Sequence, residues 1–138
     1  MSGRKAFLDT NLFIYLIEEN ELYLNKVYNM LHFLEQNSYE IITSTLTLGE
    51  ILTKPYKDNR LDLVKQYKDF FSDMELIELN SEIASMFANI RAKYNIKTPD
   101  AVQLASAIYG NADLFVTNDD RLSRFENNKC KVVLLNKF

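Results

Sequence analysis

The stretch Lys5-Ala-Phe-Leu-Asp9-Thr10-Asn11 decides how this sequence folds. It leads from a short apolar strand into an acid, and the apolar run Leu12-Phe-Ile-Tyr-Leu-Ile17 follows directly. That run is too long for a second strand and is predicted to be a helix. Asp9 therefore stands at the carboxyl end of a strand, the edge at which open α/β sheets bind ligands. An acid at this point either caps the helix or takes part in chemistry.

The composition is that of one ordinary globular domain over residues 1–138, with 47% hydrophobic residues. No apolar run approaches the roughly 20 residues that a membrane span needs, and the amino terminus lacks a secretion signal. The single Cys130 cannot form a disulfide within the chain, which fits a reducing cytoplasm. We therefore expect a cytoplasmic protein with no membrane partner.

The formal net charge of −3 argues against a protein that binds nucleic acid through a general excess of positive charge. It does not exclude an enzyme whose acidic side chains hold cations. The one histidine, His32, lies off the apolar stripe of its predicted helix and is expected to be a surface or half-buried residue rather than a ligand.

Outward from the first stretch, predicted strands and helices alternate. Periodicity predicts helices over residues 25–36, 59–71 and 81–94, and strands over residues 40–43, 75–79, 113–117 and 131–135. Unbroken apolar runs in the last two strands indicate burial on both faces, and hence a parallel sheet with helices on each side.

Two further helices have recognisable ends. Ser44 or Thr45 is predicted to cap a helix that runs through Thr53 and is stopped by Pro55. Thr98-Pro99-Asp100 is predicted to start a helix that runs to about residue 110, with Thr98 as the cap and Asp100 at the positive end of the helix dipole.

Four acids stand out, and each has a purely structural explanation. Asp9 and Asp119 could cap the helices that follow them, and Asp100 could serve the helix dipole. Glu50 stands four residues before Lys54, the favoured orientation for a helical ion pair. Apolar neighbours on the same helix nevertheless predict that Glu50 is partly buried, and a buried carboxylate needs a cation.

Right-handed crossovers would bring these four positions to one edge of a parallel sheet. Carboxylates gathered there would repel one another unless a divalent metal neutralised them. Oxygen ligands with no histidine or cysteine nearby favour Mg²⁺ or Mn²⁺ over zinc. Such a site suits phosphodiester hydrolysis, in which metal ions activate water and stabilise the leaving oxygen.

At this point the chain resembles the PIN-domain nucleases. The matching pieces cover nearly the whole chain in the family's order: Phe7-Leu-Asp-Thr-Asn11, Thr45-Leu-Thr-Leu-Gly-Glu50, Thr98-Pro-Asp-Ala101 with Ala105, and Val116-Thr-Asn-Asp119 with Leu122. The resemblance implies a three-layer α/β/α sandwich around a mostly parallel sheet, with the first strand at its centre.

The resemblance also implies functional roles. Asp9, Glu50, Asp100 and Asp119 would be the catalytic acids that hold Mg²⁺ or Mn²⁺, with Asp120 as an additional candidate ligand. Three polar residues would support them: Thr10, Asn11 and Thr117. Many members of this size are VapC-like toxins that cleave RNA, form dimers and are silenced by a cognate antitoxin, so we expect a toxin ribonuclease.

RNA must approach an acidic domain, so its positive contacts should be local. The candidates are Lys54, Lys57 and Arg60 after the Glu50 helix, Lys97 before Asp100, and Arg121 and Arg124 after Asp119. Asp120 is expected in the first turn of a short helix, paired with Arg124.

Three alternatives remain open at the level of sequence: an inactive regulatory or RNA-binding module with this fold, a nuclease of RNA processing, and a phosphoacceptor that uses Asp9. The phosphoacceptor would need a lysine on a late strand and a second acid beside Asp9. Lys131 is poorly placed for that role, and Asp9 has no acidic neighbour in the sequence.

Overall fold

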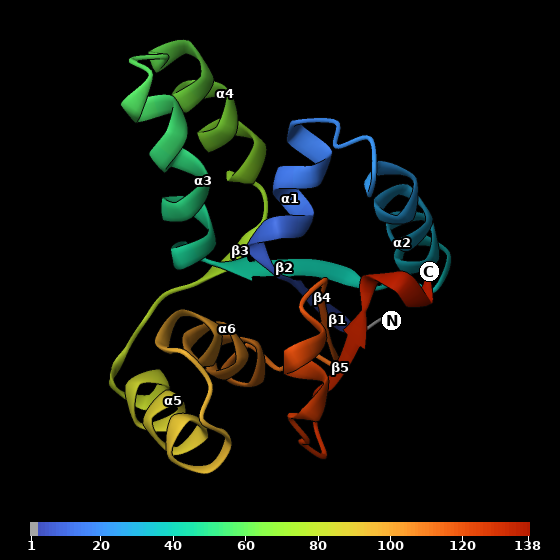
Figure 1. Cartoon of the computed structure of the whole chain (residues 1–138), viewed down its shortest axis with the longest axis vertical. Helices are drawn as coiled ribbons and strands as arrows, with labels where there is room; N and C mark the ends of the chain where they lie inside the picture. The colour runs from blue at the N-terminus through green and yellow to red at the C-terminus, as the bar shows by residue number, and fades with distance from the viewer. Residues whose placement is uncertain (1–2) are drawn as a thin grey trace.

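The computed structural model of the chain describes residues 3–138. Its described part contains a five-stranded sheet in the order β3-β2-β1-β4-β5, and every neighbouring pair is parallel. The strands are β1 (Lys5–Leu8), β2 (Glu40–Ser44), β3 (Glu75–Ile77), β4 (Leu114–Thr117) and β5 (Lys131–Leu134). The first strand is central, which confirms the expected arrangement (Figure 1).

Helices cover both faces of the sheet and complete the predicted α/β/α sandwich (Figure 1). One face carries α1 (Thr10–Ile17), α2 (Leu24–Gln36), α3 (Thr45–Lys57) and α4 (Leu61–Phe71). The other carries α5 (Ser81–Tyr94) and α6 (Thr98–Tyr109). Two 3₁₀ helices, η1 (Asp120–Arg124) and η2 (Leu135–Lys137), precede and follow β5. No helix in this described part is long and apolar enough to span a bilayer.

The central strand is buried on both faces because its side chains alternate between two cores. Phe7 lies on the α5–α6 side, where its ring stacks on that of Phe115 with centroids 5.4 Å apart. Ala6 and Leu8 lie on the other side, in the core that includes Leu12 of α1. This burial fixes the position of the residue that follows, Asp9.

Proline does not end α3 where the sequence predicted. The helix continues through Pro55 to Lys57, and the amide of Asp58 still donates to the carbonyl of Lys54 at 3.0 Å. Pro55 is buried beside α1 and α4, where it lines a groove with Ile14 and Leu63. Tertiary packing therefore holds this last turn, although proline removes one hydrogen bond from the helix.

Other boundaries also differ from the prediction. Thr98 is not the cap of α6: Lys97 occupies that position without a side-chain capping bond, and Thr98 is the first helical residue. The helix expected from residue 59 begins at Leu61, because Asn59 adopts a left-handed backbone with φ 53°. The strand expected over residues 75–79 ends at Ile77.

The interpretation of the last strand as buried on both faces is wrong. Val132, Val133 and Leu134 are only half-buried, because β5 is an edge strand with a single neighbour. The same interpretation holds for β4, which lies between β1 and β5 and buries Phe115, Val116 and Thr117.

Candidate metal centre

The structure brings the four acids together at the carboxyl-terminal edge of the sheet. Asp9 follows β1, Asp119 follows the neighbouring β4, Asp100 lies in the first turn of α6 and Glu50 in the second turn of α3. All four line one open cavity of about 200 Å³. Thr10, Asn11 and Gln103 also line it.

Asp9 has both of the roles that the sequence left open for it. As the cap of α1, its Oδ1 accepts from the backbone N–H of Thr10 at 2.9 Å. Its Oδ2 accepts from the hydroxyl of buried Thr117 at 2.8 Å. Burial nonetheless raises the pKa of Asp9 to about 6. The two hydrogen bonds lower this pKa in part, and the negative charges of Asp100 and Glu50 raise it further. A capping role alone does not require an acid in such a costly position.

The pKa values of Asp100 and Asp119 are shifted in opposite directions. Burial raises the pKa of Asp100, and the charge of Asp119 raises it further. Asp119 is held by Arg121, whose Nε and Nη2 donate to its two carboxylate oxygens at 3.0 and 2.7 Å. These hydrogen bonds lower the pKa of Asp119. One carboxylate at this edge thus already binds a cationic group.

Glu50 departs from its expected environment. It is exposed, although the sequence predicted partial burial. Its side chain lines the open cavity and also the edge of a groove between α1, α3 and α4. Lys54 forms its ion pair with Glu18 at 3.6 Å. The carboxylate of Glu50 instead accepts from the hydroxyl of Thr10 at 2.6 Å. The interpretation of Glu50 as a simple ion-pair partner of Lys54 therefore loses its support.

Comparison with known proteins places the chain in a family. The sequence profile of the PIN domain matches residues 6–128. The chain belongs to the PIN domain family. No curated protein matches it by sequence.

Three solved structures share the fold of this PIN domain. A toxin-antitoxin complex from Klebsiella pneumoniae has a chain that is 20% identical, with a TM-score of 0.75, covering 95% of this chain and 98% of the other. VapBC2 from Rickettsia felis, bound to a promoter DNA fragment, is 24% identical, with a TM-score of 0.72 and coverage of 94% and 97%. VapBC-5 from Mycobacterium tuberculosis is 18% identical, with a TM-score of 0.59 and coverage of 94% and 98%.

The predicted supporting residues of the PIN domain lie at the cavity or beside it. Thr10 and Thr117 are buried and donate to Glu50 and Asp9. Asn11 is exposed at the rim. Sequence reasoning missed Gln103, which is 2% exposed and also lines the cavity. The available signal was an amide side chain in the middle of a run of small and apolar residues.

Asp120 lies outside the cavity. It is exposed, and it occupies the first turn of η1, as the sequence predicted. Its expected pairing with Arg124 is absent among the described ion pairs, and Arg124 donates to the carbonyl of Asn95 at 3.3 Å. The 3₁₀ geometry instead places Arg121 over Asp119, to which its backbone N–H also donates at 3.0 Å.

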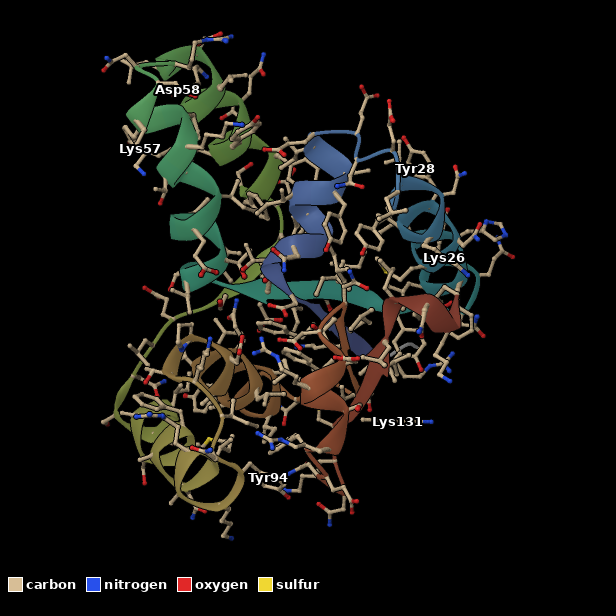
Figure 2. The ribbon with its side chains drawn as sticks, in the orientation of Figure 1. Lys26, Tyr28, Lys57, Asp58, Tyr94 and Lys131 are labelled. Carbon is tan, nitrogen blue, oxygen red and sulfur yellow. The ribbon has the colours of Figure 1, made fainter. Side chains whose placement is uncertain are left out.

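The other positive candidates are not equivalent. The charge of Lys97 reaches the cavity, because it lowers the pKa of both Asp100 and Asp119. Lys57 lies at the far end of α3, at the tip of the helix pair that extends from the sheet (Figure 2). Arg60 pairs with Asp62 at 2.8 Å. Lys97 and Arg121 are therefore the positive side chains whose charges act on Asp100 and Asp119.

The donor chemistry of the site fits a hard divalent cation. The available ligands are carboxylate, hydroxyl and amide oxygens, which Mg²⁺ and Mn²⁺ prefer. The crowded carboxylates and the raised pKa of Asp9 add a requirement for positive charge. Among residues 3–138, no three acidic, histidine or cysteine side chains are already close enough together to form a preassembled metal cluster.

Proposed function

We propose that this PIN domain protein is a divalent-metal-dependent endoribonuclease and the toxin of a toxin–antitoxin pair. The observation that carries the proposal is the gathering of Asp9, Glu50, Asp100 and Asp119 on one cavity, although they come from four separate segments. The raised pKa of Asp9 supports it, because a buried carboxylate at a crowded edge needs a compensating cation. Membership of the PIN family supports the nuclease assignment.

In this proposal the four carboxylates hold Mg²⁺ or Mn²⁺. The bound metal would activate a water molecule and stabilise the leaving oxygen of the phosphodiester. Thr117 holds Asp9 from inside the sheet through its 2.8 Å hydrogen bond. Thr10 holds Glu50 in the same way at 2.6 Å. Both acids are thereby oriented before a metal or substrate arrives, and such preorganisation lowers the cost of binding.

The positive side chains near the cavity would receive the RNA backbone. Lys97 is exposed at the start of α6, and Arg121 is 65% exposed beside Asp119. If a cation took the place of Arg121 at Asp119, the guanidinium would become available to a phosphate, which arginine binds in a forked geometry. Lys54 and Arg124 lie further along α3 and η1 and would contact more distant phosphates.

The fold neighbours support the toxin assignment, because they come from a toxin-antitoxin complex and from VapBC systems. We therefore infer a cognate antitoxin and a homodimer as partners, and the cytoplasm as the location where the RNA is cut. An inactive PIN module would keep the fold without cleavage, and a processing nuclease would cleave without an antitoxin.

Cleavage of RNA by the purified chain tests the proposal. Structured and unstructured RNAs are incubated with Mg²⁺, with Mn²⁺ and with EDTA. We expect cleavage of single-stranded segments only when metal is present, and its loss in Asp9→Asn. The control is Asp120→Asn, which also removes one carboxylate charge, from an exposed position next to Asp119 and outside the cavity. Equal cleavage in EDTA would contradict the metal mechanism, and no cleavage under any condition would favour the inactive module.

A further inference from the structure

A buried polar network lies beneath the acidic cavity, between α1, β2, α3 and α6. Its centre is Gln103 of α6, whose amide nitrogen donates to the hydroxyls of Thr47 at 2.8 Å and Thr10 at 3.2 Å. Its amide oxygen accepts from the hydroxyl of Ser44. Thr43 continues the network, with hydroxyl oxygens 2.9 Å apart between it and Thr47. All five side chains are at most 7% exposed.

The hydrogen atoms in this network can be counted. Both amide hydrogens of Gln103 are used, one by each threonine. Glu50 as a carboxylate can only accept, so the 2.6 Å contact requires the single hydroxyl hydrogen of Thr10. The Thr10 oxygen can then receive the amide of Gln103 and the hydroxyl hydrogen of Thr47, whose oxygen lies 3.1 Å away. The donors are therefore ordered in one direction, from Gln103 through Thr10 to the carboxylate of Glu50.

The network joins the segments that carry the acids. Gln103 lies one helical turn after Asp100, and Thr10 is the residue after Asp9. Thr47 lies three residues before Glu50 on α3. An apolar core could fill this space without the cost of burying five polar side chains. Their presence directly under the cavity indicates that they fix the position of a side chain at the cavity surface.

Among the four acids, Glu50 is the one whose side-chain position depends most on such a hydrogen bond. It is exposed on a helix and has a long side chain with several rotamers, whereas Asp9 is short and is held at both oxygens. Its contact with Thr10 links it to the buried framework.

We propose that Gln103 is a positioning residue of this site: through the hydroxyl of Thr10 it orients the carboxylate of Glu50 toward the metal. The inference rests on the proposed metal-dependent function. Gln103 acts on the metal only through Thr10 and Glu50, so its loss weakens metal binding without removing a ligand. Residues that orient metal ligands typically contribute about 10- to 100-fold in metal affinity.

Mn²⁺ titration of the full chain, followed by the rise in thermal unfolding midpoint, tests this role. Gln103→Met keeps the side-chain volume and removes both donors. We expect the Mn²⁺ concentration at half-maximal stabilisation to rise about tenfold. Thr10→Val should weaken binding at least as much, whereas Thr10→Ser should stay close to wild type. Ser106→Ala is the matched control, because this buried α6 residue forms no described hydrogen bond with the network.

The double variant Gln103→Met/Thr10→Val separates positioning from a general loss of packing. If Gln103 acts through Thr10, the double variant binds Mn²⁺ no more weakly than Thr10→Val alone, since coupled residues are not additive. If the two substitutions caused independent packing defects, their losses of Mn²⁺ binding free energy would add instead.

Each result bears on one claim. An unchanged Mn²⁺ response in Gln103→Met, or additive losses in the double variant, would overturn the positioning role and leave the proposed function standing. If Gln103→Met does not fold, Thr10→Val decides, and a wild-type Mn²⁺ response in that variant overturns the role. A wild-type chain that does not respond to metal would contradict both the proposed function and this inference.

Discussion

The two ends of the sheet differ in how their acidic side chains are partnered. At the amino-terminal end the side chain of Lys5 pairs with Glu75 at 2.8 Å, and its backbone N–H donates to Asp113 at 2.9 Å. At the carboxyl-terminal end four acids share one cavity, and among the described ion pairs only Asp119 has a basic partner. The first end is arranged for stability. The second gathers acids on one cavity, and we propose that a divalent cation compensates their charge.

The largest expected effect separates two adjacent acids at the second end. Asp119→Asn should lower the single-turnover rate of RNA cleavage at saturating Mn²⁺ at least about 100-fold, on the order of 2.7 kcal/mol of barrier. Asp120→Asn should cost less than about tenfold, because Asp120 is exposed outside the cavity. If Asp120→Asn is the more damaging change, Asp120 is the ligand.

A second prediction concerns the metal-free protein. The pKa of Asp9 is about 6 in the folded chain and 3.8 ordinarily, so the folded state binds a proton more readily between these values. The wild type should therefore lose stability relative to Asp9→Asn as the pH rises from about 4 to about 7. This shift corresponds to about 3 kcal/mol at pH 7. Because asparagine has one acceptor oxygen for the two hydrogen bonds that Asp9 accepts, the net advantage of Asp9→Asn should be about 1–2 kcal/mol.

Chemical denaturation of both proteins in EDTA, at several pH values, measures this difference. Asp113→Asn, at the other end of the sheet, is the control and should show no such gain. An Asp9→Asn protein that is less stable than wild type at pH 7 would mean that the carboxylate serves the fold.

The smallest expected effect is a loss of stability rather than a gain, and it concerns the amino-terminal end of the sheet. Glu75→Gln removes the partner of Lys5 and should destabilise the chain by about 0.5 kcal/mol, because the pair is partly exposed. The loss should be the same with and without Mg²⁺. Thermal unfolding in both buffers checks it, and a gain in stability would remove the contrast between the two ends.

The sequence predicted the features that depend on local pattern. Period-two and period-3.6 runs indicated the strands and helices, and acids placed after apolar strands indicated the functional edge. The resemblance to the PIN family supplied the central position of β1, which the strand order confirms.

Features that depend on distant neighbours were not predictable. Pro55 stays inside α3, where it is buried and lines a groove with Ile14 of α1, which is remote in sequence. The half-burial of β5 follows from its place at the sheet edge. Gln103 was visible only as an amide in an apolar run, and its partners come from three other elements.

Thermal unfolding of the wild type and Asp100→Asn, with Mg²⁺ and with EDTA, tests the central claim most directly. The wild type should gain stability with metal, about 1.4 kcal/mol when the free ion is tenfold above its Kd. Asp100→Asn should melt in EDTA at the wild-type temperature or higher, because it relieves repulsion, and should lose most of the gain. A destabilised Asp100→Asn protein that still responds fully to Mg²⁺ would contradict the account and leave Asp100 as a partner of the helix dipole.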